Sequence, residues 1–174
     1  MRKISILLLI LAMAFLISTA TAGVIVTVNA GTAGEGKTAT IPVTVNGASN
    51  LGAMDLVLTY DPTVLKFTSV ELGDLSTNGI VEGKEVQSGM AKISFADTKG
   101  ISGDGNILKV TFDVTGKKGS TTNLGVSAQA YGLDLKDIPT TAQGGAIAVK
   151  SGIEMAIIIA SLSIGIVFFK KRRG

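Results

Sequence analysis

The sequence predicts an all-β fold, a sandwich of two sheets built from nine strands, and two observations support it. Between residues 23 and 149, apolar side chains recur at every second position in short segments, which is the pattern of half-buried strands. Glycine, asparagine and aspartate separate these segments, and no segment shows a sustained 3.6-residue period. The nine predicted strands are, in order, Val24–Ala30, Lys37–Gly47, Leu51–Tyr60, Val64–Gly73, Ile80–Gln87, Met90–Ala96, Ile107–Val114, Asn123–Leu133 and Gly144–Val149.

The predicted turns follow from residues that adopt positive φ at low cost. Ser88-Gly89 predicts a tight hairpin between the fifth and sixth strands. Three further dipeptides predict turns by the same chemistry: Asn46-Gly47, Asn78-Gly79 and Asp104-Gly105.

The triplet Tyr60-Asp61-Pro62 interrupts the apolar alternation between the third and fourth strands. The side chain of Asp61 can cap a turn, and Pro62 presets the φ angle of its first central residue. Tyr60 is then the last core-facing residue of its strand, and the triplet predicts a bend rather than a site of chemistry.

Residues 1–22 have the pattern of a signal peptide. Arg2 and Lys3 precede an apolar stretch over residues 4–17, and Ala20-Thr21-Ala22 forms a small-x-small cleavage site. We therefore expect a mature chain that starts at Gly23, with an uncleaved membrane anchor as the alternative.

Residues 153–169 are predicted to form a transmembrane helix, reached through a short tether at residues 150–152. The nineteen residues from Ser151 to Phe169 carry one charge and would span about 28 Å as a helix. The basic tail at residues 170–174 resists translocation, which predicts a single-pass cell-membrane protein with residues 23–149 extracellular and the tail cytoplasmic. The alternatives are a buried core helix and a cell-wall sorting signal based on residues 138–142.

The charges and missing residue types of the ectodomain exclude several functions. Residues 23–149 hold nine lysines, no arginine and twelve acids, a net charge of −3, which argues against binding of nucleic acid. The chain has no cysteine and no histidine, so disulfides, thiolate metal sites and histidine-dependent catalysis are excluded and no enzyme is expected. Residues 102–106 offer one acid and one amide, too few ligands for a calcium loop, so no cofactor is expected on this chain.

Several motifs, in a fixed order, resemble the cohesin domains of cellulosome scaffoldins and their non-cellulosomal relatives. They are G-x-T-x-x-I-P-V-T-V at 36–45, M-D-L-V-L-T-Y-D-P-T-V-L-K-F at 54–67, Gly73-Asp74, K-I-S-F-A-D at 92–97, D-G-x-I-L-K-V-T-F at 104–112 and Gly144-Gly145-Ala146-Ile147. The resemblance implies a nine-stranded jelly-roll sandwich that binds dockerins, small helical modules with two calcium loops. Binding would use a flat face of the third, fifth, sixth and eighth strands, and calcium would belong to the partner.

Alternation along the strands selects the candidate binding residues. Asp55 lies in the middle of an apolar strand and must face solvent or a partner, because burying an unpaired acid is costly. The resemblance implies that Asp55 hydrogen-bonds the dockerin helix and that Asp97, at the end of the sixth strand, lies near a second contact position. The full set of predicted partner-binding residues is Ala53, Asp55, Val57, Ser94, Asp97 and Ala128.

The predicted function is a non-catalytic, membrane-anchored cohesin-like module that holds a secreted dockerin-bearing partner at the cell surface. Polysaccharide would be reached only through that partner. Two alternatives remain open: a structural cell-envelope protein that self-associates, and a carbohydrate-binding module that uses Tyr131 as an exposed aromatic platform.

Overall fold

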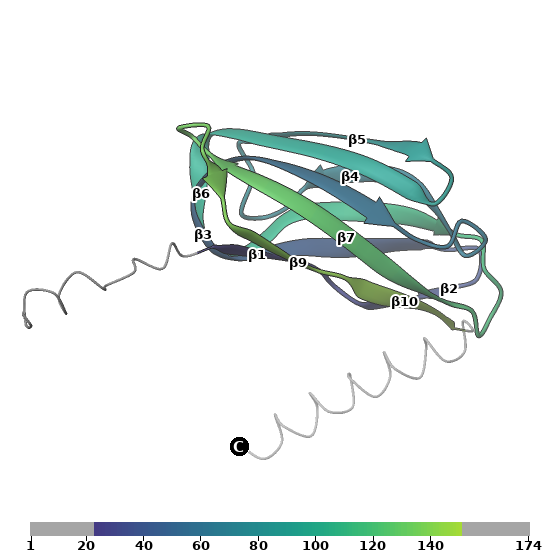
Figure 1. Ribbon diagram of the computed structural model, residues 1–174. Coiled ribbons are helices and arrows are strands. Elements are labelled where there is room, and N and C mark those ends of the chain that lie inside the picture. The colour runs from purple at the N-terminus through teal and green to yellow at the C-terminus, as the bar shows by residue number, and fades with distance from the viewer. Residues whose placement is uncertain (1–22, 151–174) are drawn as a thin grey trace, which may run out of the picture.

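The computed structural model describes residues 23–150 as an elongated sandwich of strands (Figure 1). The ten strands are β1 Val24–Val28, β2 Gly31–Gly34, β3 Thr38–Thr59, β4 Leu65–Leu72, β5 Ile80–Gln87, β6 Met90–Val114, β7 Thr121–Gly132, β8 Asp137–Ile138, β9 Thr140–Gln143 and β10 Gly145–Lys150. The prediction of an all-β fold is confirmed, because residues 23–150 contain no helix.

The predicted number of nine strands is wrong, because two pairs of predicted strands merge and three short strands are added. The second and third predicted strands form the continuous β3, and the sixth and seventh form β6. The added strands are β2, β8 and β9.

Bends inside the two long strands replace turns that we expected there. Gly47 has a φ of 73° and Gly105 a φ of 155°, yet the chain continues forward at both positions. The pairing of β3 with β6 shifts register at several points between Val43 and Ala53. The backbone N–H of Gly47 donates a 2.7 Å hydrogen bond to the carboxylate of Asp104, which joins the two bends. The predicted turns at Asn46-Gly47 and Asp104-Gly105 are therefore irregularities within one strand pair.

Each long strand contributes to both layers of the sandwich. The first part of β3 pairs with β1 and with the last part of β6, while the last part of β3 pairs with β7 and the first part of β6. In one layer, β4 pairs with the last part of β6 and β9 pairs with β1. In the other layer, β5 pairs with the first part of β6. Strand β10 pairs with the start of β7, and β2 pairs with β10.

The core lies between the layers and follows the predicted alternation. Met54, Leu56 and Leu58 are 0–1 % exposed, as expected for the inward side of the strand. Phe112 is fully buried and packs edge-on against Tyr60, with ring centroids 5.1 Å apart. One continuous hydrophobic cluster therefore supports the outward side of each strand.

The bend after β3 has the predicted chemistry. The carboxylate of Asp61 accepts hydrogen bonds from the backbone N–H and the hydroxyl of Thr63, at 2.8 and 2.6 Å. These bonds lower the pKa of Asp61, the hydroxyl bond more than the backbone bond. The triplet Tyr60-Asp61-Pro62 thus ends β3 and turns the chain toward β4.

The predicted membrane and targeting segments fall outside the described residues. This applies to the signal peptide at residues 1–22, the helix at residues 153–169 and the basic tail at residues 170–174. Of the predicted tether, Lys150 belongs to β10 and the rest is not described. Residues 23–150 include no helix with the length and hydropathy needed to cross a bilayer.

Candidate functional site

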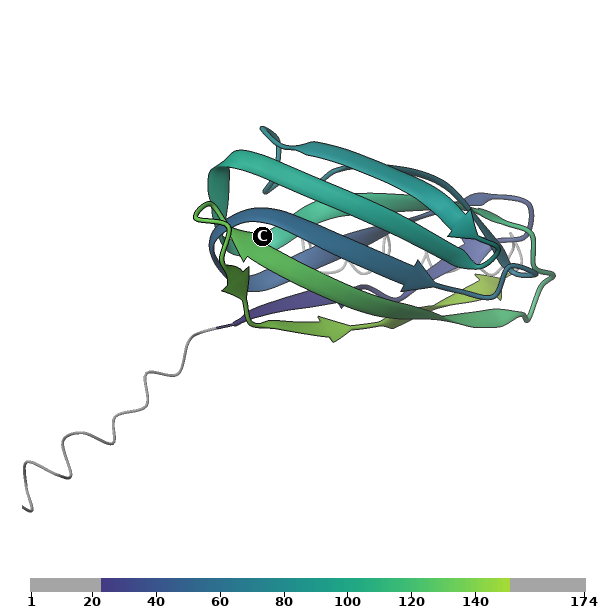
Figure 2. The same cartoon turned by 45° about the horizontal axis from the view of Figure 1, so that its top comes forward.

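The candidate site is the outer side of four adjacent strands. Strand β5 pairs with the first part of β6, which pairs with the last part of β3, which in turn pairs with β7. Figure 2 shows these four strands side by side. We call the outward-facing side chains of this four-strand sheet the binding face. It combines the four strands that the cohesin resemblance implied, here named β3, β5, β6 and β7.

Strand registers arrange the outward side chains in rows that cross the sheet, and three of these rows contain Ala53, Asp55 and Val57 of β3. The first row combines two alanines with the larger Ile80 and Tyr131, the second is polar with two acids, and the third carries two lysines. In the order β5, β6, β3, β7, the rows are Ile80, Ala96, Ala53 and Tyr131; Glu82, Ser94, Asp55 and Gln129; Lys84, Lys92, Val57 and Ser127.

Asp55 and Ser94 meet at the centre of the second row. They are direct cross-strand partners, and the Ser94 hydroxyl donates a 2.6 Å hydrogen bond to Oδ1 of Asp55. Gln129 is the partner of Asp55 on the opposite side. The structure therefore brings together two of the predicted residues and holds the central carboxylate in one orientation.

Ala53 and Val57 flank Asp55 on the same side of β3, as predicted. Both are half-buried, and Tyr131, beside Ala53, is half-buried as well. These short or partly covered side chains leave the centre of the face flat. A flat face suits a rigid element of a partner better than a small molecule.

Asp97 lies apart from the other predicted residues. It is 5 % exposed, and its Oδ1 accepts a 2.7 Å hydrogen bond from the backbone N–H of Lys99. It follows Ala96, the last β6 residue of the first row. The carboxylate of Asp97 thus stabilises the local backbone at the edge of the binding face.

The predicted outward orientation of Ala128 is wrong. Ala128 is the cross-strand partner of Leu56, a fully buried residue, and it packs against the hydrophobic core. Side chains of directly paired residues lie on the same side of a sheet, so Ala128 faces inward. The outward residues of β7 are its neighbours Ser127 and Gln129.

Strand β5 contributes residues that the sequence analysis did not select. Glu82 and Lys84 face outward, because a Cβ on the intervening Gly83 would contact the core side chains of Val70, Phe67 and Ile93. Counting back from the Ser88-Gly89 hairpin would have placed Glu85 rather than Lys84 opposite Lys92. The register shift between Glu85 and Gln87 moves the pairing by one residue. The local sign of this shift is that Gly83, which has no side chain, occupies the inward position between Glu82 and Lys84.

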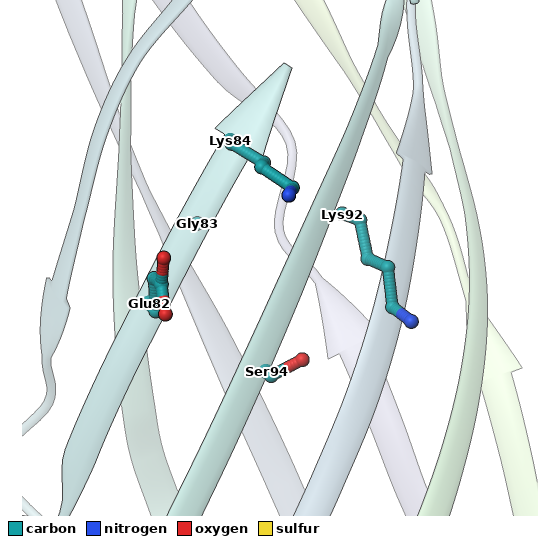
Figure 3. Close-up of a pocket in the computed structure, with 5 residues that line it drawn as sticks. All are labelled: Glu82, Gly83, Lys84, Lys92 and Ser94. Atoms are coloured by element: carbon teal, nitrogen blue, oxygen red, sulfur yellow. The ribbon is translucent and has the colours of Figure 1, made fainter. Parts of the chain in front are cut away.

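The hairpin itself is confirmed, since β5 ends at Gln87 and β6 starts at Met90. A shallow hollow of about 210 Å³ lies between these two strands and is lined by Glu82, Gly83, Lys84, Lys92 and Ser94 (Figure 3). In the part of the chain that the structure describes, no three acidic side chains gather into a group suited to a metal ion. The face offers hydrogen-bonding groups and charges of both signs.

Residues 23–149 match the family model of the cohesin domain. The chain belongs to the cohesin family. This confirms the resemblance drawn from the sequence motifs. Cohesin domains are non-catalytic binding modules, so the prediction that the protein is not an enzyme is also confirmed.

The chain is also similar to part of a curated protein. The chain is 36 % identical over 106 residues to cellulose-binding protein A of Clostridium cellulovorans. The match covers 58 % of this chain but 6 % of that protein, which is therefore far longer than this cohesin.

Solved cohesin structures share the fold. A non-cellulosomal cohesin from the archaeon Archaeoglobus fulgidus superposes with a TM-score of 0.67 at 27 % identity, covering 78 % of this chain and 96 % of that one. The sixth cohesin of scaffoldin B from Acetivibrio cellulolyticus, solved in complex with a dockerin mutant, gives 0.65 at 22 % identity, with 74 % and 99 % covered. A type I cohesin–dockerin complex from Clostridium thermocellum gives 0.64 at 20 % identity, with 77 % and 97 % covered.

Proposed function

We propose that this cohesin binds a dockerin module through the binding face on β5, β6, β3 and β7. The observation that carries the proposal is the Asp55–Ser94 pair at the centre of this flat, exposed face. Family membership and the dockerin complexes of related cohesins support the choice of partner.

The mechanism is recognition by a face that is already formed. Asp55 is held by Ser94 through Oδ1, and within residues 23–150 its Oδ2 has no hydrogen-bond partner. A carboxylate has about four acceptor sites, so the central acid can take a donor from the dockerin without releasing Ser94. The buried side chains of β3 and β6 keep the two strands rigid beneath it, which lowers the ordering cost of binding.

The proposal extends to the place of binding. The mostly apolar residues 153–169, followed by the cations at 170–173, would anchor the chain in the membrane, with the cohesin outside. A secreted protein with a dockerin would then be held at the cell surface. Calcium would belong to the dockerin, and any polysaccharide would be bound by the partner rather than by this chain.

Calorimetric titration of residues 23–150 with a panel of recombinant dockerins, in calcium and in EDTA, tests the function. The fragment suits the test because it contains the hydrophobic cluster of the described residues, and the match covers 96 % of the solved Archaeoglobus fulgidus cohesin chain. We expect at least one dockerin to bind in calcium and to be lost in EDTA. Absence of binding across the panel would contradict the proposal, and concentration-dependent assembly of the fragment alone would favour a self-associating envelope protein.

A further inference from the structure

The third row of the binding face contains two lysines in direct cross-strand contact. Lys84 on β5 pairs with Lys92 on β6, and both side chains are exposed. Figure 3 shows them on the same side of the sheet, beside Glu82 and Ser94. Within residues 23–150 neither lysine forms an ion pair.

Such a pair works against the stability of the sheet. Like charges directly opposite each other on neighbouring strands repel, so the fold gains nothing from this arrangement. The nearby acid Glu85 offers no compensation, because it pairs with the buried Ala91 and so lies on the other side of the sheet. There it accepts a 2.8 Å hydrogen bond from the Tyr60 hydroxyl and a 3.2 Å bond from the N–H of Gly89. Two unpaired cations on a face built for binding therefore point to an anion supplied by the partner.

The neighbouring row has the opposite charge. Glu82 and Asp55 lie in the second row, two residues along the strands from Lys84 and Val57. Two residues along a strand span about 6.8 Å. Four residues along a helix span about 6 Å, so side chains one helical turn apart match the spacing of the two rows.

We propose that the lysine pair Lys84–Lys92 receives an acidic side chain of the dockerin's contact helix, while Glu82 and Asp55 receive a basic side chain one turn away on the same helix. This inference rests on the proposed function and specifies the charge pattern of the partner. It makes Lys84, Lys92 and Glu82 residues that determine which dockerins bind.

The test uses a recombinant dockerin that carries Lys and Glu four residues apart on its contact helix, and a second version with Lys at both positions. Both are titrated into wild-type residues 23–150 and into the double variant K84E/K92E. The control is K37E/K66E, which changes the net charge equally but alters exposed lysines outside the binding face. Thermal melting of each variant checks that it remains folded.

We expect the wild-type cohesin to bind the Lys/Lys dockerin about tenfold more weakly than the Lys/Glu dockerin. The K84E/K92E variant should reverse this preference, the control should retain it, and 1 M salt should reduce it, because the Debye length falls to about 3 Å. Equal binding of both dockerins by the wild type would overturn the charge pattern and leave the proposed function intact. Binding of neither would overturn the charge pattern, and absence of binding across the whole dockerin panel would overturn the proposed function as well.

Discussion

The Ser94 hydroxyl donates a 2.6 Å hydrogen bond to Asp55, which joins the two long strands at the centre of the binding face. Both residues lie on the outward side, directly above a core formed by Leu56 and Ile93. Their polarity is therefore not needed for folding. A fixed acid on an exposed, rigid surface is available to accept a hydrogen bond from a partner.

Replacing Asp55 with alanine should weaken dockerin binding by about 10- to 100-fold, because a hydrogen bond to a charged group is lost at the centre of the interface. Stability to urea should change by less than about 0.5 kcal/mol, since the side chain is outside the core. Asp113→Ala is the matched control: Asp113 is exposed on the same strand as Ser94 but pairs with β4, outside the binding face. Unchanged affinity in Asp55→Ala would remove this residue from the site.

Ser94 should act by positioning Asp55. Its replacement by alanine frees the carboxylate, and ordering one side chain on binding costs about 0.5–1.5 kcal/mol. We expect a loss of affinity of about 2- to 10-fold, with recovery in Ser94→Thr, which keeps the hydroxyl. A combined Asp55→Ala, Ser94→Ala variant should bind no more weakly than Asp55→Ala alone. Additive losses in calorimetric titration would show instead that Ser94 contacts the dockerin directly.

Alternation along the strands was sufficient to predict which side of the last part of β3 faces outward. Met54 and Leu56 had to be buried, so Asp55 between them had to face outward. The same reasoning failed at Ala128. Its strand mixes alanine, glycine and serine, whose hydropathies contrast too little to reveal which side is inside.

The continuity of β3 and β6 was not predictable from local signals. Asn46-Gly47 and Asp104-Gly105 have the chemistry of turns, but the pairing between the two strands keeps the chain moving forward at both. Likewise, the outward position of Lys84 depends on a register shift near Val86. Such irregularities depend on contacts between distant segments, which a local pattern does not contain.

Tyr60 should ionise at unusually high pH. Burial is the main cause that raises its pKa to about 12, and the hydrogen bond to Glu85 adds to it. Because an unfolded tyrosine has a pKa of about 10, folding favours the protonated hydroxyl. The resulting stabilisation is complete below about pH 10 and is lost as the pH rises toward 12.

The titration of Tyr60 can be isolated in a Tyr131→Phe background, because these are the only two tyrosines in the chain. Ultraviolet absorbance of tyrosinate should show a midpoint near pH 12. Glu85→Ala should lower that midpoint while leaving it above 10, since burial remains. An identical midpoint in both proteins would contradict a contribution from Glu85.

Substitutions at Asp97 can distinguish a role in dockerin binding from a role in stabilising the fold. A contact with the dockerin remains a prediction from the family resemblance, but its 5 % exposure and its bond to the N–H of Lys99 favour a structural role. We expect Asp97→Ala to lower the free energy of unfolding by about 1–3 kcal/mol, because the N–H of Lys99 loses the buried carboxylate that accepts its hydrogen bond. Dockerin affinity should stay within about twofold of wild type. Asp97→Asn, which keeps an acceptor oxygen, should recover most of the stability. A large loss of affinity in a fully stable Asp97→Asn protein would instead place the carboxylate in the interface.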